Sequence, residues 1–188
     1  MTHRERVTAA LEHREADRVP IDLSGHRSSG IAAIAYPKLR AHLGLPERPV
    51  RVYDVIQQLA VVDEDVLERF GVDTIELGRG FALDETDWKP WVLPDGTDCL
   101  VPAWTNLERE ADRWVIKSES GRVLAHMPDG TLYFEQTYYP LGDDDEVGGP
   151  TEAMGESMWT GVASPPGPVD GRVLAAGAKE LCANTDRA

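Results

Sequence analysis

Residues 17–30, with the sequence DRVPIDLSGHRSSG, decide how the rest of the chain is interpreted. Val19, Ile21 and Leu23 alternate in the way that suits one face of a pleated strand. Pro20 lacks a backbone N–H, so it belongs in the first residues of a strand or on a sheet edge. The stretch therefore predicts a short buried strand over 19–23 that ends in a polar loop, residues 24–30. In α/β folds, and above all in (β/α)₈ barrels, the loops at this end of the strands bind ligands.

Composition and charge limit the class of protein. The chain has 188 residues, is 41% hydrophobic and carries a formal net charge of −14. Such an acidic chain is a poor partner for nucleic acid or an anionic membrane, since both need a basic surface. No apolar run approaches the roughly 20 residues of a membrane span, and the first residues have no signal-peptide character. Cys99 and Cys182 form no CxxC motif, which favours free thiols and a cytoplasmic location.

Helical spacing of apolar residues recurs along the chain. A Thr2–Glu5 capping box predicts a helix over 3–13, and a second helix is expected from Ala35 to the C′ glycine Gly44. Residues 50–53 read as a short extended piece and 54–60 as a short helical turn. Asp63 is expected to cap a helix over 64–70, and a last helix is expected over about 170–184.

A second strand is predicted over 72–77, with Gly78–Gly80 as its exit loop. The residue composition then changes. Tryptophans alternate with residues typical of tight turns, and a Pro-Asp-Gly-Thr sequence at 94–97 recurs at 128–131. We expect four regions. Residues 1–84 are expected to form the N-terminal part of a barrel, and residues 85–141 an inserted antiparallel hairpin or meander. Residues 142–169 are expected to be an acidic Gly/Pro-rich linker, and residues 170–188 a helix that leads toward a further barrel strand.

The candidate site residues come from the loops after the two predicted strands and from one turn. His26 is the candidate catalytic acid or base, because imidazole titrates near neutral pH. Arg27 and Arg79 are the candidate ligands for an anionic substrate. Gln57 and Gln58 are the remaining candidate substrate-binding residues. Each also has a structural interpretation: a helix-capping histidine, salt-bridged arginines, and glutamines that hydrogen-bond a loop.

No metal site is predicted from the residues themselves. Residues 143–146 form a run of four carboxylates but lack the glycine and terminal glutamate of a calcium-binding loop. Cysteine and histidine do not cluster anywhere in the chain.

Several segments together resemble the uroporphyrinogen decarboxylase superfamily, and more narrowly its branch of corrinoid- and coenzyme M-linked methyltransferases. No single motif carries the resemblance; the order of the motifs does. They are RERVTAALEH (4–13), DRVP (17–20), RSSGI (27–31) before the Tyr36 helix, VYDVIQQLA (52–60), FGVD (70–73) and YPL (139–141).

The resemblance implies a (β/α)₈ barrel, which typically needs about 250 residues. Setting aside 85–169 leaves roughly 100 residues, enough for two βα units rather than eight. The sequence is therefore expected to form a partial TIM barrel with an inserted meander. It would correspond to the N-terminal half of the enzyme, either truncated or completed by a second chain or by a homo-oligomer. Alone it is expected to be inactive.

The family's two activities place different demands on these residues. For the decarboxylase, the resemblance implies two loop arginines, which would fall on Gly25 and Ser29, and an aspartate, which would fall on Gly80. Glycine and serine cannot replace an arginine or an aspartate, although Arg27 lies between the two arginine positions. In the methyltransferase branch it implies a zinc site of His-x-Cys plus Cys in the C-terminal half. This chain therefore has no expected cofactor of its own, whereas zinc and a corrinoid are compatible with the complete enzyme.

The sequence thus favours the N-terminal half of a methyltransferase that works with a corrinoid protein and a small anionic or methylated substrate. One alternative is a uroporphyrinogen decarboxylase acting on an acidic tetrapyrrole. The other is a non-catalytic half-barrel that complements a second chain.

Overall fold

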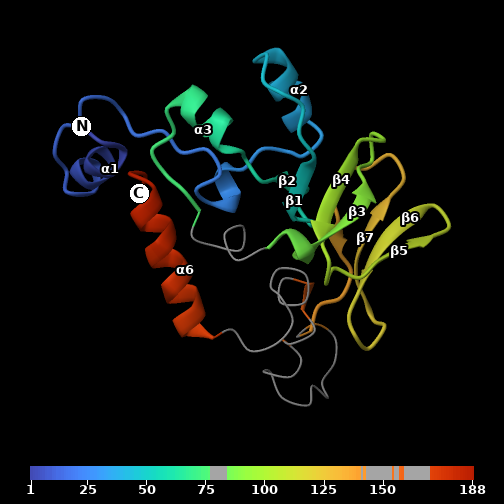
Figure 1. The fold of residues 1–188 in the computed structure, drawn as a ribbon. Coiled ribbons are helices and arrows are strands. Elements are labelled where there is room, and N and C mark those ends of the chain that lie inside the picture. Colours follow the sequence, from blue (N-terminus) through green and yellow to red (C-terminus); the bar gives the residue numbers. More distant parts are fainter. Residues whose placement is uncertain (77–83, 141, 143–153, 155–156, 159–169) are drawn as a thin grey trace.

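The structure is a computed structural model that describes residues 1–76, 84–140, 142, 154, 157–158 and 170–188. The described residues form a mixed α/β fold with two four-stranded sheets and four α-helices (Figure 1). The helices are α1 (His3–Leu11), α2 (Tyr36–His42), α3 (Glu64–Phe70) and α6 (Gly171–Asn184). No helix in this part of the chain is long and apolar enough to cross a membrane.

The four predicted helices are confirmed, with their ends set by local chemistry. Thr2 and Glu5 form the predicted capping box at the start of α1. Helix α2 is followed by Gly44 and α3 by Gly71, both at positive φ, as expected for C-terminal glycines. The Asp170 side chain accepts the Arg172 N–H at the start of α6.

The expected cap of α3 is wrong in one respect: the Asp63 side chain makes no capping hydrogen bond. Its carboxylate instead accepts from the Tyr36 hydroxyl at 2.7 Å and from Arg40 at 2.9 Å. Tyr36 is 1% exposed, and burial, reinforced by the hydrogen bond to Asp63, raises the pKa of its phenol to about 12. The carboxylate therefore ties α2 to α3.

The first sheet has the strand order β2-β1-β4-β3, from β1 (Val50–Asp54), β2 (Leu59–Ala60), β3 (Trp88–Val92) and β4 (Asp98–Pro102). Strands β1 and β4 run parallel, and the other neighbours run antiparallel. The extended piece predicted at 50–53 is therefore an internal strand. The helical turn predicted over 54–60 is confirmed as a turn only at 55–58, since Asp54 ends β1 and the last two residues form β2, in which Ala60 pairs with Val52.

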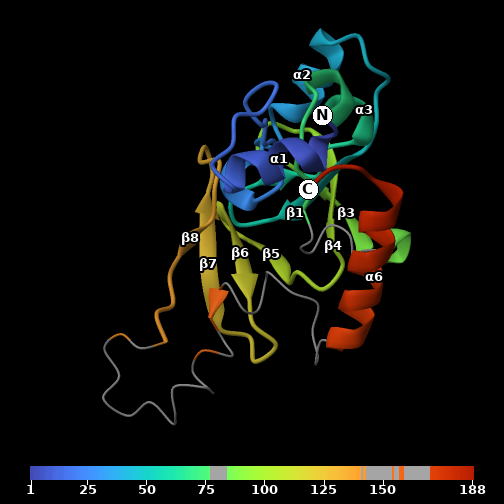
Figure 2. The ribbon, with the colours of Figure 1, turned by 90° about the vertical axis from the view of Figure 1, so that its left-hand side faces the viewer.

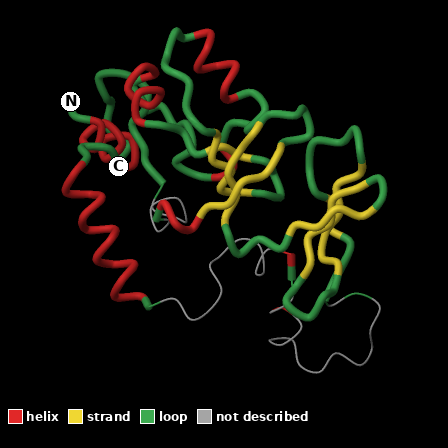
Figure 3. Tube along the Cα trace, turned by 45° about the vertical axis from the view of Figure 1, so that its right-hand side comes forward, coloured by secondary structure: helices red, strands yellow, loops and turns green. Residues whose placement is uncertain are grey.

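The second sheet is an antiparallel meander in chain order: β5 (Leu107–Glu110), β6 (Arg113–Lys117), β7 (Val123–Pro128) and β8 (Glu135–Gln136). It corresponds to the predicted hairpins. The two sheets meet at Trp91, whose ring lies 5.5 Å from that of Trp114 and 6.4 Å from that of Phe134. Figure 3 shows the two groups of strands side by side, with α6 on the far side of the molecule.

The two predicted barrel strands do not form as strands: 19–23 and the described residues 72–76 have no regular strand structure. The segments nevertheless lie side by side, since the Asp73 N–H donates to the Ile21 carbonyl at 2.8 Å. In a parallel ladder the Ile21 N–H would donate to Gly71. It donates instead to the Asp73 carboxylate at 2.8 Å, while the Gly71 carbonyl accepts from Arg18. Side-chain hydrogen bonds thus replace the ladder.

Residue 188 also hydrogen-bonds to the segment 72–76. The Ala188 N–H donates to the Asp73 carbonyl at 2.9 Å, and the Ile75 N–H donates to the Ala188 carbonyl at 2.8 Å. These two bonds flank Thr74 in the pattern of a parallel pair. Arg4 fixes the same region, because its guanidinium donates to the carbonyls of Cys182, Thr185 and Arg187. Figure 2 shows the two ends of the chain close together. The described segments form no closed ring of strands.

Candidate functional site

The predicted catalytic histidine lies at the start of a short 3₁₀ turn, Arg27–Ser29. The His26 ring is exposed, and its Nδ1 accepts the Ser28 backbone N–H at 3.1 Å. The His26 backbone N–H donates to the Ser29 hydroxyl at 3.3 Å. This is the capping arrangement that the sequence offered as the structural interpretation. A catalytic role for His26 stays a prediction.

Arg27 and Gln57 meet at one buried carboxylate, that of Asp54 at the end of β1. The Arg27 guanidinium lies 3.5 Å from Asp54 Oδ2, and Gln57 Nε2 donates to the same oxygen at 3.1 Å. The Gln57 backbone N–H donates to Asp54 Oδ1 at 2.9 Å. The structure therefore brings these two candidates together around a side chain that is 2% exposed.

Gln58 is separate from them. Its side-chain amide is buried and donates to the Val55 backbone carbonyl at 2.6 Å. The backbone carbonyl of Gln58 accepts the Ala33 N–H at 2.7 Å. Its φ is +55°, so the backbone itself is constrained at this turn. The remaining candidate, Arg79, and the exit loop 78–80 lie outside the described residues.

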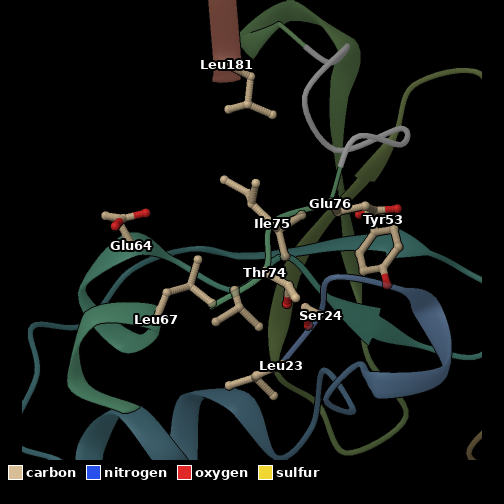
Figure 4. Close-up of a pocket in the computed structure, with 11 residues that line it drawn as sticks. Leu23, Ser24, Tyr53, Glu64, Leu67, Thr74, Ile75, Glu76 and Leu181 are labelled. Atoms are coloured by element: carbon tan, nitrogen blue, oxygen red, sulfur yellow. The ribbon is translucent and has the colours of Figure 1, made fainter. Parts of the chain in front are cut away.

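A pocket of about 210 Å³ lies where three segments end (Figure 4). Leu23 and Ser24 lie at the end of the first predicted strand, Tyr53 lies near the end of β1, and residues 74–76 belong to the second predicted strand. Helix α6 contributes Leu181 from the opposite side in Figure 4. Two side chains of α3 and two residues just before that helix complete the wall. The described lining residues are Leu23, Ser24, Tyr53, Val61, Val62, Glu64, Leu67, Thr74, Ile75, Glu76 and Leu181.

Most of this wall is aliphatic, and its polar part consists of hydroxyl and carboxyl groups. The Ser24 hydroxyl oxygen is buried and has no hydrogen-bond partner among the described residues. The Thr74 hydroxyl donates to Asp22 at 2.5 Å. Ser24 has a φ of +64°, a conformation that is uncommon for residues other than glycine. The fold thus holds one unsatisfied hydroxyl at the rim of an apolar space.

The charges around the pocket are largely compensated. The described lining includes no Arg, Lys or His side chain. Glu64 is ion-paired with Arg187, and Glu76 also has an interaction partner. Behind Thr74, burial raises the pKa of the Asp22 carboxyl, but hydrogen bonds from Thr74, Ser29 and Gly25 outweigh burial and lower that pKa below its ordinary value.

Neither His26 nor Arg27 is among the described residues that line the pocket. The sequence analysis missed Tyr53, Thr74 and Leu181 as lining residues. For Tyr53 and Thr74 a signal was present, since each falls near the end of an extended segment. For Leu181 there was none, because only the packed position of α6 brings it to the pocket.

The described residues contain no group of three His, Cys, Asp or Glu side chains that could hold a metal ion. Cys99 is buried in β4, and Cys182 is exposed on α6. They therefore do not fit the zinc ligand set that the family resemblance implies.

Comparison with known proteins gives no match to a family model, to a curated protein or to a solved structure.

Proposed function

We propose that this chain contributes the first βα units of a barrel enzyme of the uroporphyrinogen decarboxylase type, and that this enzyme transfers a methyl group to a corrinoid protein. The observation that carries the proposal is the order of three neighbouring segments. Residues 21, 73 and 188 are joined by backbone hydrogen bonds in the order in which they occur along the chain. Helix α3 comes before the second segment, and α6 comes before the third.

This order is that of consecutive βα units, in which each helix returns the chain to a neighbouring parallel strand. The pocket supports the same interpretation, because it lies at the carboxyl ends of the first two segments, where barrel enzymes bind their substrates. The remaining strands of the barrel would come from polypeptide beyond the described segments.

Two observations favour methyl transfer over decarboxylation. A Cβ atom at Gly25 would lie 2.5 Å from Thr74 Oγ1 and from Asp22 Oδ1, so an arginine cannot occupy this position unless the Thr74 and Asp22 side chains shift. The family's first carboxylate-binding arginine therefore has no room here. In addition, the pocket of about 210 Å³ is smaller than the roughly 300–1,000 Å³ of sites for drug-sized ligands, and a tetrapyrrole is larger still.

In this proposal the chain's own residues bind and orient the methyl donor. The aliphatic wall excludes water, and the Ser24 hydroxyl is placed to hydrogen-bond a donor oxygen. The corrinoid, held by a partner protein, would supply the metal centre that accepts the methyl group. The cysteines and histidines described in this chain do not fit a zinc site, so the ligands of any zinc ion would come from the rest of the enzyme.

The test compares two reactions for the chain with and without the product of the adjoining coding sequence. The first assay follows the conversion of free cob(I)alamin to methylcobalamin in the presence of a methyl ether. The second follows the loss of carboxyl groups from uroporphyrinogen. We expect methylcobalamin only when both polypeptides are present. Decarboxylation would instead support the tetrapyrrole enzyme, and neither reaction, together with stable co-purification, would support a non-catalytic half-barrel.

A further inference from the structure

Two hollows in the protein surface meet at Val92, a half-exposed residue of the edge strand β3. The first hollow, of about 630 Å³, lies along β3 and β4 and includes Asp98. The second, of about 410 Å³, is lined by residues of both Pro-Asp-Gly turns and by Trp114. Val92 lines both hollows, so they adjoin, and we name them together the β3 groove. We propose that the β3 groove binds a proline-rich segment of a partner protein that carries a basic residue at one end.

The wall of the β3 groove is largely apolar and is held in place by hydrogen bonds. The Leu93 N–H donates to the Thr97 carbonyl at 2.9 Å in the first turn. In the second turn, the Asp129 N–H donates to the Asp112 carbonyl at 2.8 Å, and the Asp129 carboxylate accepts from Arg109 at 2.7 and 2.6 Å. The groove is therefore formed before a ligand binds, which lowers the entropic cost of binding. Its apolar side chains are Pro49, Pro90, Val92, Pro94, Trp114 and Met127.

The strand beside the groove is unsuited to pairing with an incoming β-strand. In the described sheet, β4 is the only neighbour of β3, and Pro90 stands at the centre of β3. Hydrogen bonds to the loop between β4 and β5 and to the first turn begin at Asp87 and Leu93, so by the alternation of an antiparallel pair Pro90 faces the open edge. Proline has no N–H, and a strand added here would lose a ladder hydrogen bond. The ligand is therefore an extended segment that needs no ladder.

The second hollow offers the surface that a polyproline II segment binds. Such a segment is extended without ladder hydrogen bonds, and it docks in aromatic-lined grooves with little loss of conformational entropy. The Trp114 ring lines the hollow together with Pro94 and Pro128. Two contacts fix its orientation, because the Arg109 guanidinium lies 5.9 Å from the ring centroid and the Trp91 ring meets it edge-on at 5.5 Å. We therefore assign prolines to this part of the ligand.

The charge of the ligand follows from the first hollow. Glu47 and Asp98 belong to its lining, and neither has an ion-pair partner within the described part of the chain. The arginine of this lining is already engaged, since Arg48 lies 3.5 Å from Asp63 and 3.4 Å from Asp65. Uncompensated carboxylates beside an apolar surface attract a lysine or an arginine. The formal net charge of −14 acts in the same direction and opposes a second copy of this chain as the occupant.

The experiment measures peptide binding to the full chain by isothermal titration calorimetry. The probe, acetyl-RRPLPPLPP-amide, has two basic residues followed by a proline-rich segment. One control, acetyl-EEPLPPLPP-amide, reverses the charge, and the other, acetyl-RRALAALAA-amide, replaces the prolines by alanine. We expect saturable binding of the probe and at least about tenfold weaker binding of both controls. A wild-type chain that does not bind the probe, or that binds either control as tightly, would overturn the proposal.

A first pair of variants locates the binding surface. Val92→Lys puts a cation where the two hollows meet and should weaken probe binding at least about tenfold. Its control, Val173→Lys, changes an exposed valine of α6 that lies outside both hollows and should leave the affinity unchanged. Circular dichroism checks that each variant folds. Equal affinity of Val92→Lys and the wild type for the probe would overturn the proposal.

A second pair of variants tests the charge. Asp98→Asn removes one carboxylate of the first hollow and should weaken probe binding about two- to fivefold, the effect of one exposed ion pair. Its control, Glu119→Gln, lies in the turn between β6 and β7, outside both hollows, and should bind the probe like the wild type. Equal affinity of the two variants for the probe would contradict a basic end of the ligand at Asp98.

A second copy of the chain is the alternative occupant, and light scattering of the wild type and of Val92→Lys detects it. A wild-type dimer that Val92→Lys dissociates would assign the β3 groove to a second copy and overturn the proposal. Because no methyl-transfer assay enters these measurements, a negative result here leaves the proposed function intact.

Discussion

Ile21 and Asp73 are joined by two hydrogen bonds of 2.8 Å, one between their backbones and one from the Ile21 N–H to the Asp73 carboxylate. The same carboxylate, which is fully buried, accepts from Arg18 at 2.6 Å and from Arg6 at 2.5 Å, and lies 2.7 Å from His3 Nδ1. One side chain therefore holds α1, the segment 17–23 and the segment 72–76 together.

Asp73→Asn should destabilise the fold strongly. Removing one partner of a buried ion pair leaves uncompensated buried charge and costs about 3–5 kcal/mol of unfolding free energy. Urea unfolding measures the change. The matched control is Asp129→Asn, which removes an exposed partner of Arg109 and should leave the urea midpoint nearly unchanged. Equal midpoints for the two variants would mean that Asp73 does not organise the fold.

The same residue predicts how stability depends on pH. Burial alone would raise the pKa of the Asp73 carboxyl, but hydrogen bonds from Ile21, Arg18, His3 and Arg6 outweigh burial and lower that pKa well below its usual range. A lowered folded-state pKa gives stability that is present above the unfolded value of about 3.9 and is lost as the pH falls further. Urea unfolding between pH 6 and 3 should show this loss in the wild type and a shallower slope in Asp73→Asn.

Gly25→Ala should destabilise the chain although alanine is only one carbon larger. Its Cβ would meet Thr74 Oγ1 and Asp22 Oδ1 at 2.5 Å and Thr74 Cβ at 2.8 Å, a degree of overpacking that costs about 1–3 kcal/mol. Thermal unfolding measures it. Gly171→Ala is the control, because a Cβ there meets nothing within 4 Å, and it should be neutral or slightly stabilising. If Gly25→Ala leaves the thermal stability unchanged, the claim that position 25 has no room for a larger side chain such as arginine is contradicted.

The two cysteines should differ in reactivity. Burial raises the pKa of the Cys99 thiol to about 12, and the neighbouring Asp98 and Asp95 act in the same direction. Because the thiolate is the reactive form, iodoacetamide should alkylate Cys182 in the folded chain and Cys99 only after unfolding. Mass spectrometry of digested protein gives the answer. Rapid labelling of Cys99 under native conditions would contradict the packing of β4.

The sequence predicted the helices and the hairpins well, because their signals are local. The Thr2–Glu5 capping box, the glycines after α2 and α3, and the repeated Pro-Asp-Gly turns all act over a few residues. The Gly96 and Gly130 backbones have φ values of +85° and +83°, as those turns require.

The strands predicted at 19–23 and at the described residues 72–76 were wrong for a non-local reason. Their alternating apolar pattern is real, but the carboxylate of Asp73 and the guanidinium of Arg18 take the backbone partners that a ladder would use. Nothing in the local pattern at 19–23 reveals a carboxylate about 50 residues away. The pocket lining could not be predicted from the local sequence either, because Leu181 reaches the pocket only through the packed position of α6.

The most direct measurement of the central claim is the rate of methylcobalamin formation from a methyl ether by two variants of α6. Leu181→Trp changes a residue that lines the pocket, and its control Leu174→Trp changes an exposed residue outside the pocket. Each is assayed with the adjoining gene product at a donor concentration below saturation. If the pocket lined by Ser24, Thr74 and Leu181 holds the methyl donor, Leu181→Trp lowers the rate at least about tenfold and Leu174→Trp leaves it unchanged. Equal rates for the two variants and the wild type, or no methyl transfer by any of them, would contradict the account.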